Sequence, residues 1–177
     1  GHEESMIGTE DFSPAITKLN EAGAETIICI GEYGFTAPLT RQYRQINPDI
    51  EIAGFPCTYT QQLIELGKDA VEGVSFPVDF FAGSDDPVIS AFVKSYKEKY
   101  GSVPSNFSAK AYDTAGLLIE AAIKAGTVSD SQAIRDAVAK TAYDGVTGFT
   151  EFNERGDANK IFKVVTIKDG KFVEIGK

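Results

Sequence analysis

The stretch IICIGEYGFTAP, residues 27–38, decides the fold of this chain. It begins as an unbroken apolar run, which is typical of a buried strand of a parallel sheet. Gly31 ends the run, and polar and aromatic residues then lead to Pro38, where we expect a helix to begin. Tyr33 therefore stands where a buried strand reaches the surface and gives way to a helix.

Strand and helix signals alternate around this stretch. The predicted elements are strands at 26–31, 50–54 and 71–77 and helices at 13–22, 38–46 and 60–66. Two consecutive strand–helix–strand crossovers imply an α/β fold with a parallel, doubly wound sheet.

The pattern changes after Pro77. Helices are predicted at 86–100, 106–125 and 129–140, the last with Ser129 and Gln132 as a capping box. Asp169-Gly170 then joins two alternating strands in a C-terminal hairpin spanning 161–175. Three helices without a strand between them cannot continue a doubly wound sheet. They form either a helical subdomain or a cover for a sheet supplied by other residues.

Composition excludes several classes of function. The chain has 177 residues, 42% of them hydrophobic, and a net charge of -9, which disfavours nucleic acid and anionic membrane surfaces as partners. No apolar run reaches the roughly 18 residues that a membrane span needs. Two cysteines and one near-terminal histidine give no metal site. The chain begins Gly1-His2, which fits a removed leader or a cloning scar.

The candidate site lies beyond the carboxyl ends of two strands, where open parallel sheets bind ligands. Its residues are Glu32, Tyr33, Gly34 and Phe35 after the first strand and Phe55, Pro56, Cys57, Thr58 and Tyr59 after the second. Gly34 lets the backbone approach a ligand, and Tyr33 offers a flat face with a hydroxyl at its tip. The competing interpretation is that Tyr33 and Phe55 only seal the end of the sheet.

Motifs typical of enzymes and cofactor sites are missing. The sequence has no G-x-G-x-x-G after the strand, no phosphate-binding G-x-x-x-x-G-K-[ST] and no G-x-S-x-G. Without a usable histidine, neither a serine nor a cysteine nucleophile has its base. We therefore expect no catalytic residues and no cofactor. A small α/β hydrolase or transferase is the enzyme alternative, and it would require turnover that depends on Tyr33.

Several segments in order resemble one family. They are DFSPAITKLNEAGAETIICIG, RQYRQ, VEGV, DDPVISAFVKSYKEKYG, AKAYDTAGLLIEAA, DGVTGFTEFNERGD and KDGKF. From about Thr9 to Lys177 the chain resembles the C-terminal half of a type I periplasmic solute-binding protein. The subfamily it resembles binds leucine, isoleucine and valine for branched-chain amino-acid ABC transporters.

The resemblance implies a chain that crosses between two lobes. Residues 1–77 would belong to the second lobe, 78–145 would be a helical part of the first, and 146–177 would recross and form the final hairpin. The hinge would lie at Pro77, Gly145 and Gly148. The strand at 26–31 would lack its usual neighbour, so we expect either a homodimer through its open edge or a segment of a longer protein.

The resemblance also assigns the site. Tyr33 occupies the place of a family tyrosine that contacts the ligand, Gly34 would give a backbone contact, and residues 55–58 would wall the pocket. The family's acidic residue, which pairs with the ligand ammonium, has Pro56 as its counterpart here. A buried ammonium without a carboxylate is costly. Either Glu32 supplies the charge, or the ligand is not an α-amino acid but an apolar or aromatic carboxylate.

The function expected from the resemblance is non-catalytic binding of a small carboxylate for an ABC transporter permease. The location would be periplasmic or extracytoplasmic, after removal of a signal peptide or as an anchored lipoprotein. The same fold also serves as the sensing domain of receptors and of amide-type regulators, which is the alternative. Whether the fragment is natural, proteolytic or engineered stays open.

Overall fold

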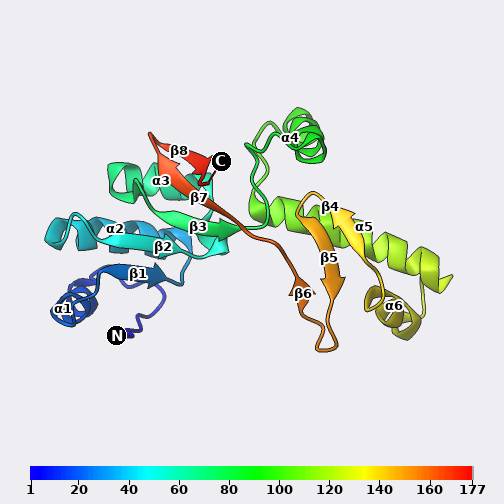
Figure 1. The fold of residues 1–177 in the computed structure, drawn as a ribbon, viewed down its shortest axis with the longest axis horizontal. Coiled ribbons are helices and arrows are strands. Elements are labelled where there is room, and N and C mark those ends of the chain that lie inside the picture. The colour runs from blue at the N-terminus through cyan, green and yellow to red at the C-terminus, as the bar shows by residue number, and fades with distance from the viewer. Residues whose placement is uncertain (177) are drawn as a thin grey trace. The chain divides into compact units, whose positions relative to one another are not determined.

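The computed structural model describes residues 1–176 and divides into two compact units. Unit 1 comprises Gly1–Val78 and the residues from Val164 on, and unit 2 comprises Asp79–Lys163. The helices and strands of unit 1, drawn in Figure 1, are α1 (Ser13–Glu21), β1 (Thr26–Cys29), α2 (Tyr33–Ile46), β2 (Glu51–Gly54), α3 (Gln61–Gly67), β3 (Ser75–Val78), β7 (Lys163–Lys168) and β8 (Lys171–Glu174).

Unit 1 is built on a five-stranded sheet in the order β1-β2-β3-β7-β8, with β1 to β3 parallel. Right-handed crossovers place α2 and α3 on the same face, where α2 reaches β1 through a contact between Thr36 and Cys29. Burial alternates along β1, β2, β3 and β7, so one face of the sheet is covered. On the other face Ile28 is 71% exposed. The predicted incomplete α/β fold is confirmed, and β1 is an open edge.

The hairpin of β7 and β8 turns at Asp169-Gly170, as predicted. Both residues have positive φ, 52° and 67°, the conformation that a two-residue type I′ turn requires. The carboxylate of Glu72 accepts hydrogen bonds from the amides of Asp169 (2.9 Å) and Gly170 (2.6 Å), which fixes the hairpin beside β3.

Unit 2 combines helices with a small antiparallel sheet in the order β4-β5-β6. Its elements are α4 (Pro87–Tyr100), α5 (Asn106–Ala125), α6 (Ser131–Val138), β4 (Tyr143–Gly145), β5 (Gly148–Phe152) and β6 (Ala158–Asn159). The core packs Phe80, Val93, Ala109 and Val146 together. Farther along α5, Ile119 and Ile123 are 62% and 74% exposed. That the helices cover a sheet upstream stays a prediction.

Several expected boundaries are wrong, and the strand expected at 26–31 ends at Cys29. The helix expected from Pro38 begins at Tyr33, because the Glu32 carbonyl already accepts from the amides of Phe35 and Thr36. Pro38 has no amide hydrogen to donate to the carbonyl of Gly34, four residues earlier in α2. The helix tolerates this proline because Gly34 is exposed, so its carbonyl is open to water.

Further errors concern β3, α6 and the second crossing. The strand expected at 71–77 is confined to Ser75–Val78, because Gly73 turns the backbone at φ 76°. The N-cap of α6 is Asp130 rather than Ser129, since its carboxylate accepts from the amides of Gln132 and Ala133.

The first crossing lies at Val78–Asp79, one residue from the predicted position, and the second lies at Lys163–Val164. The recrossing predicted to begin after residue 145, with a hinge at Gly145 and Gly148, is therefore wrong. Gly145 and Gly148 are paired across the turn of the β4–β5 hairpin inside unit 2, and the positive φ of Gly148 serves that turn. A hinge role for Pro77 stays a prediction.

Candidate functional site

The candidate site is formed by the segments that follow β1 and β2 in unit 1. The two strands are parallel, with Cys29 opposite Gly54, so both segments leave the sheet at the same edge. The first segment, 30–32, leads into α2, and the second enters a short 3₁₀ turn, Pro56–Thr58. The strand order alone therefore brings the two predicted groups of residues side by side.

The carbonyl of Gly31 joins the two segments. It accepts a hydrogen bond from the Thr58 hydroxyl at 3.0 Å and another from the Cys57 thiol at 3.3 Å. The Thr58 hydroxyl also accepts from the amide of Phe55 at 3.2 Å. Thr58 is fully buried. Its side chain holds the site together, and Cys57 contributes to the same anchor.

Tyr33 occupies the first helical position of α2, where it is half-buried. Glu32 is the N-cap, with its side chain exposed and without a capping hydrogen bond. The amides of Tyr33 and Gly34 have no carbonyl partner within the helix, and the helix dipole adds positive potential there. This helix end can therefore accept the carboxylate of a ligand.

The surface beside this helix end is open. A Cβ added to Gly34 would meet no atom within 4 Å, whereas at Gly31 it would lie 2.6 Å from the Phe35 ring. Gly31, rather than Gly34, is thus the glycine that local packing requires. Phe55 is 47% exposed, and Pro56 is half-buried.

Two expected pocket residues are instead part of the core. Tyr59 is only 6% exposed and packs edge-on against Phe172 of β8, with ring centroids 4.5 Å apart. The expected aromatic lining of Tyr33, Phe55 and Tyr59 is thus wrong for Tyr59. Thr58 is buried as well, with 0% of its surface exposed, and its hydroxyl is hydrogen-bonded to the Gly31 carbonyl. The sequence did carry a signal for this role of Thr58, because threonine hydroxyls in turns often form hydrogen bonds with the backbone.

Cys29, which ends β1 next to the candidate site, has a buried side chain. Burial raises the pKa of the Cys29 thiol, although its contact with the Thr36 hydroxyl opposes the shift, so Cys29 is a protonated core residue. No group of His, Cys, Asp and Glu side chains in residues 1–176 is arranged to hold a metal ion. A shallow hollow lies elsewhere, lined by residues such as Ile64, Lys68 and Asp69. Glu72 and the hairpin turn to which it is hydrogen-bonded also line it, and none of its lining residues belongs to the candidate site.

A family model described as "Periplasmic binding protein" matches residues 1–171. The chain belongs to the periplasmic binding protein family. Among solved structures, this periplasmic binding protein chain is similar to the leucine-binding protein LivK of Thermotoga maritima. The two are 31% identical with a TM-score of 0.88, over 97% of this chain and 49% of that one.

Two further relatives are named for binding or transporting branched-chain amino acids. LivJ of Streptococcus pneumoniae, solved with isoleucine, is 27% identical with a TM-score of 0.80, over 96% of this chain and 50% of that one. The leucine-, isoleucine-, valine-, threonine- and alanine-binding protein of Pseudomonas aeruginosa is 26% identical over 85% of this chain and 40% of that protein. The predicted resemblance is confirmed, and the chain spans about half the length of these relatives or less.

Proposed function

We propose that the chain is part of an extracytoplasmic solute-binding protein that carries a small carboxylate to an ABC transporter permease. The observation that supports this best is the edge where Tyr33, the free amides of α2 and exposed Phe55 are held together at Gly31. The relatives named above support the same class of ligand. The ligand is a branched-chain amino acid or a related apolar or aromatic carboxylate.

Each residue of the edge has a defined role in this proposal. The amides of Tyr33 and Gly34 receive a negatively charged or polar ligand group, the Tyr33 ring stacks on it, and Phe55 with Pro56 and Cys57 forms an apolar wall. Glu32 is the one carboxylate of the edge, and it is exposed. Closure of two lobes over the ligand, with a hinge at Pro77, completes the site.

Whether the ligand carries an ammonium group is tested by comparing the binding of L-leucine with that of 4-methylpentanoate, which lacks only the amino group. If Glu32 pairs with the ammonium, Glu32→Gln weakens leucine binding and leaves 4-methylpentanoate unaffected. If the ligand is not an α-amino acid, 4-methylpentanoate or benzoate binds at least as tightly as leucine, and Glu32→Gln changes neither.

Tyr33→Ala is expected to weaken ligand binding about tenfold, or ~1.4 kcal/mol, because it removes the stacking face from an otherwise intact helix end. Saturation-transfer NMR on leucine, 4-methylpentanoate and benzoate measures the loss. Tyr100→Ala is the control, since Tyr100 is 58% exposed at the end of α4 in the other unit. Equal binding by the Tyr33 and Tyr100 variants would contradict the assignment.

The open edge of β1 supports a second proposal, that the isolated chain pairs with a second copy of itself. β1 is paired on one side only, and Ile28 within it is 71% exposed on the uncovered face of the sheet. Unpaired apolar edges recruit other strands, and a lysine on the edge opposes this. No helix in the described residues has the length and hydropathy to cross a bilayer.

Native mass spectrometry of the purified chain is expected to show a dimer that Ile28→Lys converts to monomer. Ile123→Lys is the matched control, because Ile123 is 74% exposed on α5 of unit 2. A monomeric wild-type chain would refute the pairing. A dimer that Ile123→Lys dissociates would place the interface on α5 instead of β1.

A further inference from the structure

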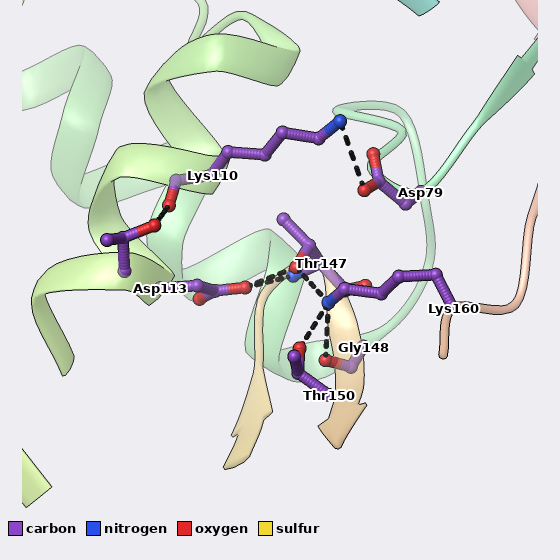
Figure 2. Close-up of polar contacts among 8 residues, drawn as sticks. Asp79, Lys110, Asp113, Thr147, Gly148, Thr150 and Lys160 are labelled. Atoms are coloured by element: carbon purple, nitrogen blue, oxygen red, sulfur yellow. Dashed lines mark hydrogen bonds and ion pairs between the residues drawn. The ribbon is translucent and has the colours of Figure 1, made fainter. Parts of the chain in front are cut away.

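Both segments that connect the two units reach unit 2 at a charged side chain. Asp79 is the first residue of unit 2 after β3, and Lys160 follows β6, shortly before unit 2 ends at Lys163. Figure 2 shows these two residues together with Lys110 and Asp113 of α5. The four side chains carry two positive and two negative charges, so the group is neutral.

Lys110 fixes the first connecting segment to α5. Its ammonium lies 3.3 Å from Oδ2 of Asp79, whose side chain is 3% exposed. An ion pair with a carboxylate this well buried resists competition from water more than a surface pair does. The start of unit 2 is therefore held on the helix that forms its core.

Asp113 fixes the β4–β5 turn to the same helix. Its carboxylate accepts from the amides of Val146 (2.9 Å) and Thr147 (2.7 Å) and from the Thr147 hydroxyl (2.6 Å). A Cβ on Gly145 would lie 2.4 Å from the Asp113 carboxyl carbon, so the turn is seated directly on the helix. Only glycine permits this approach.

Lys160 continues the chain of contacts from the turn to the second connecting segment. Its ammonium donates to the Thr147 hydroxyl at 2.7 Å, to the carbonyls of Thr147 (3.2 Å) and Gly148 (3.3 Å), and to the Thr150 hydroxyl. The Thr147 hydroxyl thus accepts from Lys160 while it donates to Asp113. Ammonium, hydroxyl and carboxylate form one directed relay (Figure 2).

The electrostatics of Lys160 reflect this half-buried position. Burial lowers the pKa of its ammonium, while the negative charges of Asp79 and Asp113 oppose the shift and Lys110 adds to it. The three N–H donors of the ammonium are shared among four oxygens, and these hydrogen bonds favour the charged form in addition. The contacts are local to unit 2 and do not involve the proposed ligand edge.

We infer that Lys160 is a positioning residue, which holds the second connecting segment on the β4–β5 turn through Thr147 and Asp113. Because Lys110 holds the first segment on the same helix, α5 carries both connections. Backbone bending between the units is then confined to residues outside these anchors, which are 161–162 on the second connection and Pro77 and Val78, before Asp79, on the first. The inference rests on these contacts alone and is independent of the proposed ligand.

Backbone ¹⁵N order parameters of the 177-residue chain test the inference. In Lys160→Met, which keeps the length and apolar part of the side chain, residues 160–162 are expected to fall from near the rigid value of about 0.85 to below about 0.6. Lys171→Met is the control, because Lys171 is exposed on β8 of unit 1. Unchanged order parameters in Lys160→Met, or an equal fall in Lys171→Met, would overturn the inference.

The ammonium gives a second, spectroscopic readout. A hydrogen-bonded ¹⁵N ammonium signal, slow to exchange with water, is expected in the wild-type chain and in Thr147→Ser, which keeps the hydroxyl. It should disappear in Lys160→Met and exchange at least about tenfold faster in Thr147→Val. An ammonium signal whose exchange rate is the same in Thr147→Val as in the wild type would show that the Thr147 hydroxyl does not hold Lys160. If Lys160→Met unfolded all of unit 2, Thr147→Val would still have to loosen 160–162 locally for the inference to stand.

Discussion

Asp113→Ala is expected to lower the unfolding free energy of unit 2 by about 3–5 kcal/mol, the largest effect of any single substitution discussed for this unit. Asp113 is 6% exposed, and its carboxylate accepts three hydrogen bonds from the β4–β5 turn. Alanine would leave two buried amides without a partner, each costing about 1–3 kcal/mol, and would leave Lys160 without its relay to a negative charge. Native-state hydrogen exchange in α5 measures the loss for unit 2 separately.

Two variants control this result. Asp113→Asn keeps the shape but turns one acceptor oxygen into a donor that faces an amide, so it should cost nearly as much as alanine. Asp136→Ala, on exposed α6 where the carboxylate pairs with Arg135, should cost less than about 0.5 kcal/mol. A loss below about 1 kcal/mol in Asp113→Ala would mean that water replaces the carboxylate easily.

Gly54→Ala is expected to lower the unfolding free energy of unit 1 by about 1–3 kcal/mol, although it adds a single methyl group. The added Cβ would lie 2.4 Å from the ring of Phe76, which is fully buried on the neighbouring strand β3. The φ of Gly54 is one that alanine adopts readily, so the cost is steric. Because Gly54 ends β2 immediately before Phe55, the change should also disturb the ligand edge.

The steric origin of this cost is tested with a double variant. Phe76→Leu is destabilising alone because it leaves a cavity, but it should recover part of the loss in the Gly54→Ala background, giving a favourable coupling. Gly34→Ala is the control, since a Cβ there meets no atom within 4 Å, and its effect should stay within about 0.5 kcal/mol. Additive losses would show that the methyl group does not contact the ring.

The order of elements could be predicted because local signals agree with the fold. Asp169-Gly170 formed the expected turn, and the apolar runs became β1 and β2. Helix starts were less predictable. Pro38 is typical of a first helical turn. However, α2 begins earlier, because the Glu32 carbonyl already accepts the first hydrogen bonds of the helix from Phe35 and Thr36. The second crossing was misplaced because Gly145 and Gly148 suggested a flexible link. They are instead paired across a hairpin turn, which Asp113, far away in sequence, holds by accepting from the amides of the turn.

The candidate site was predictable only in outline. Adjacent parallel strands bring Tyr33 and Phe55 to one edge, which strand order alone implies. Which side chains face outward depends on distant packing partners. Tyr59 is buried because Phe172 of β8 packs against it. The Thr58 hydroxyl points inward because it donates a hydrogen bond to the Gly31 carbonyl. Neither partner can be identified from the segment 55–59 alone.

The most direct test of the proposed ligand edge is a map of backbone amide shifts in the ¹⁵N-labelled chain during titration with L-leucine, 4-methylpentanoate and benzoate. Binding by one lobe alone is expected in the millimolar range, about 4 kcal/mol of binding free energy. At least one of the three ligands is expected to shift the amides of residues 31–35 and 55–58 and to leave those of the β7–β8 turn unchanged. Shifts centred on Glu72 and Asp169, or on unit 2, would contradict this expectation, as would the absence of shifts at residues 31–35 with every ligand.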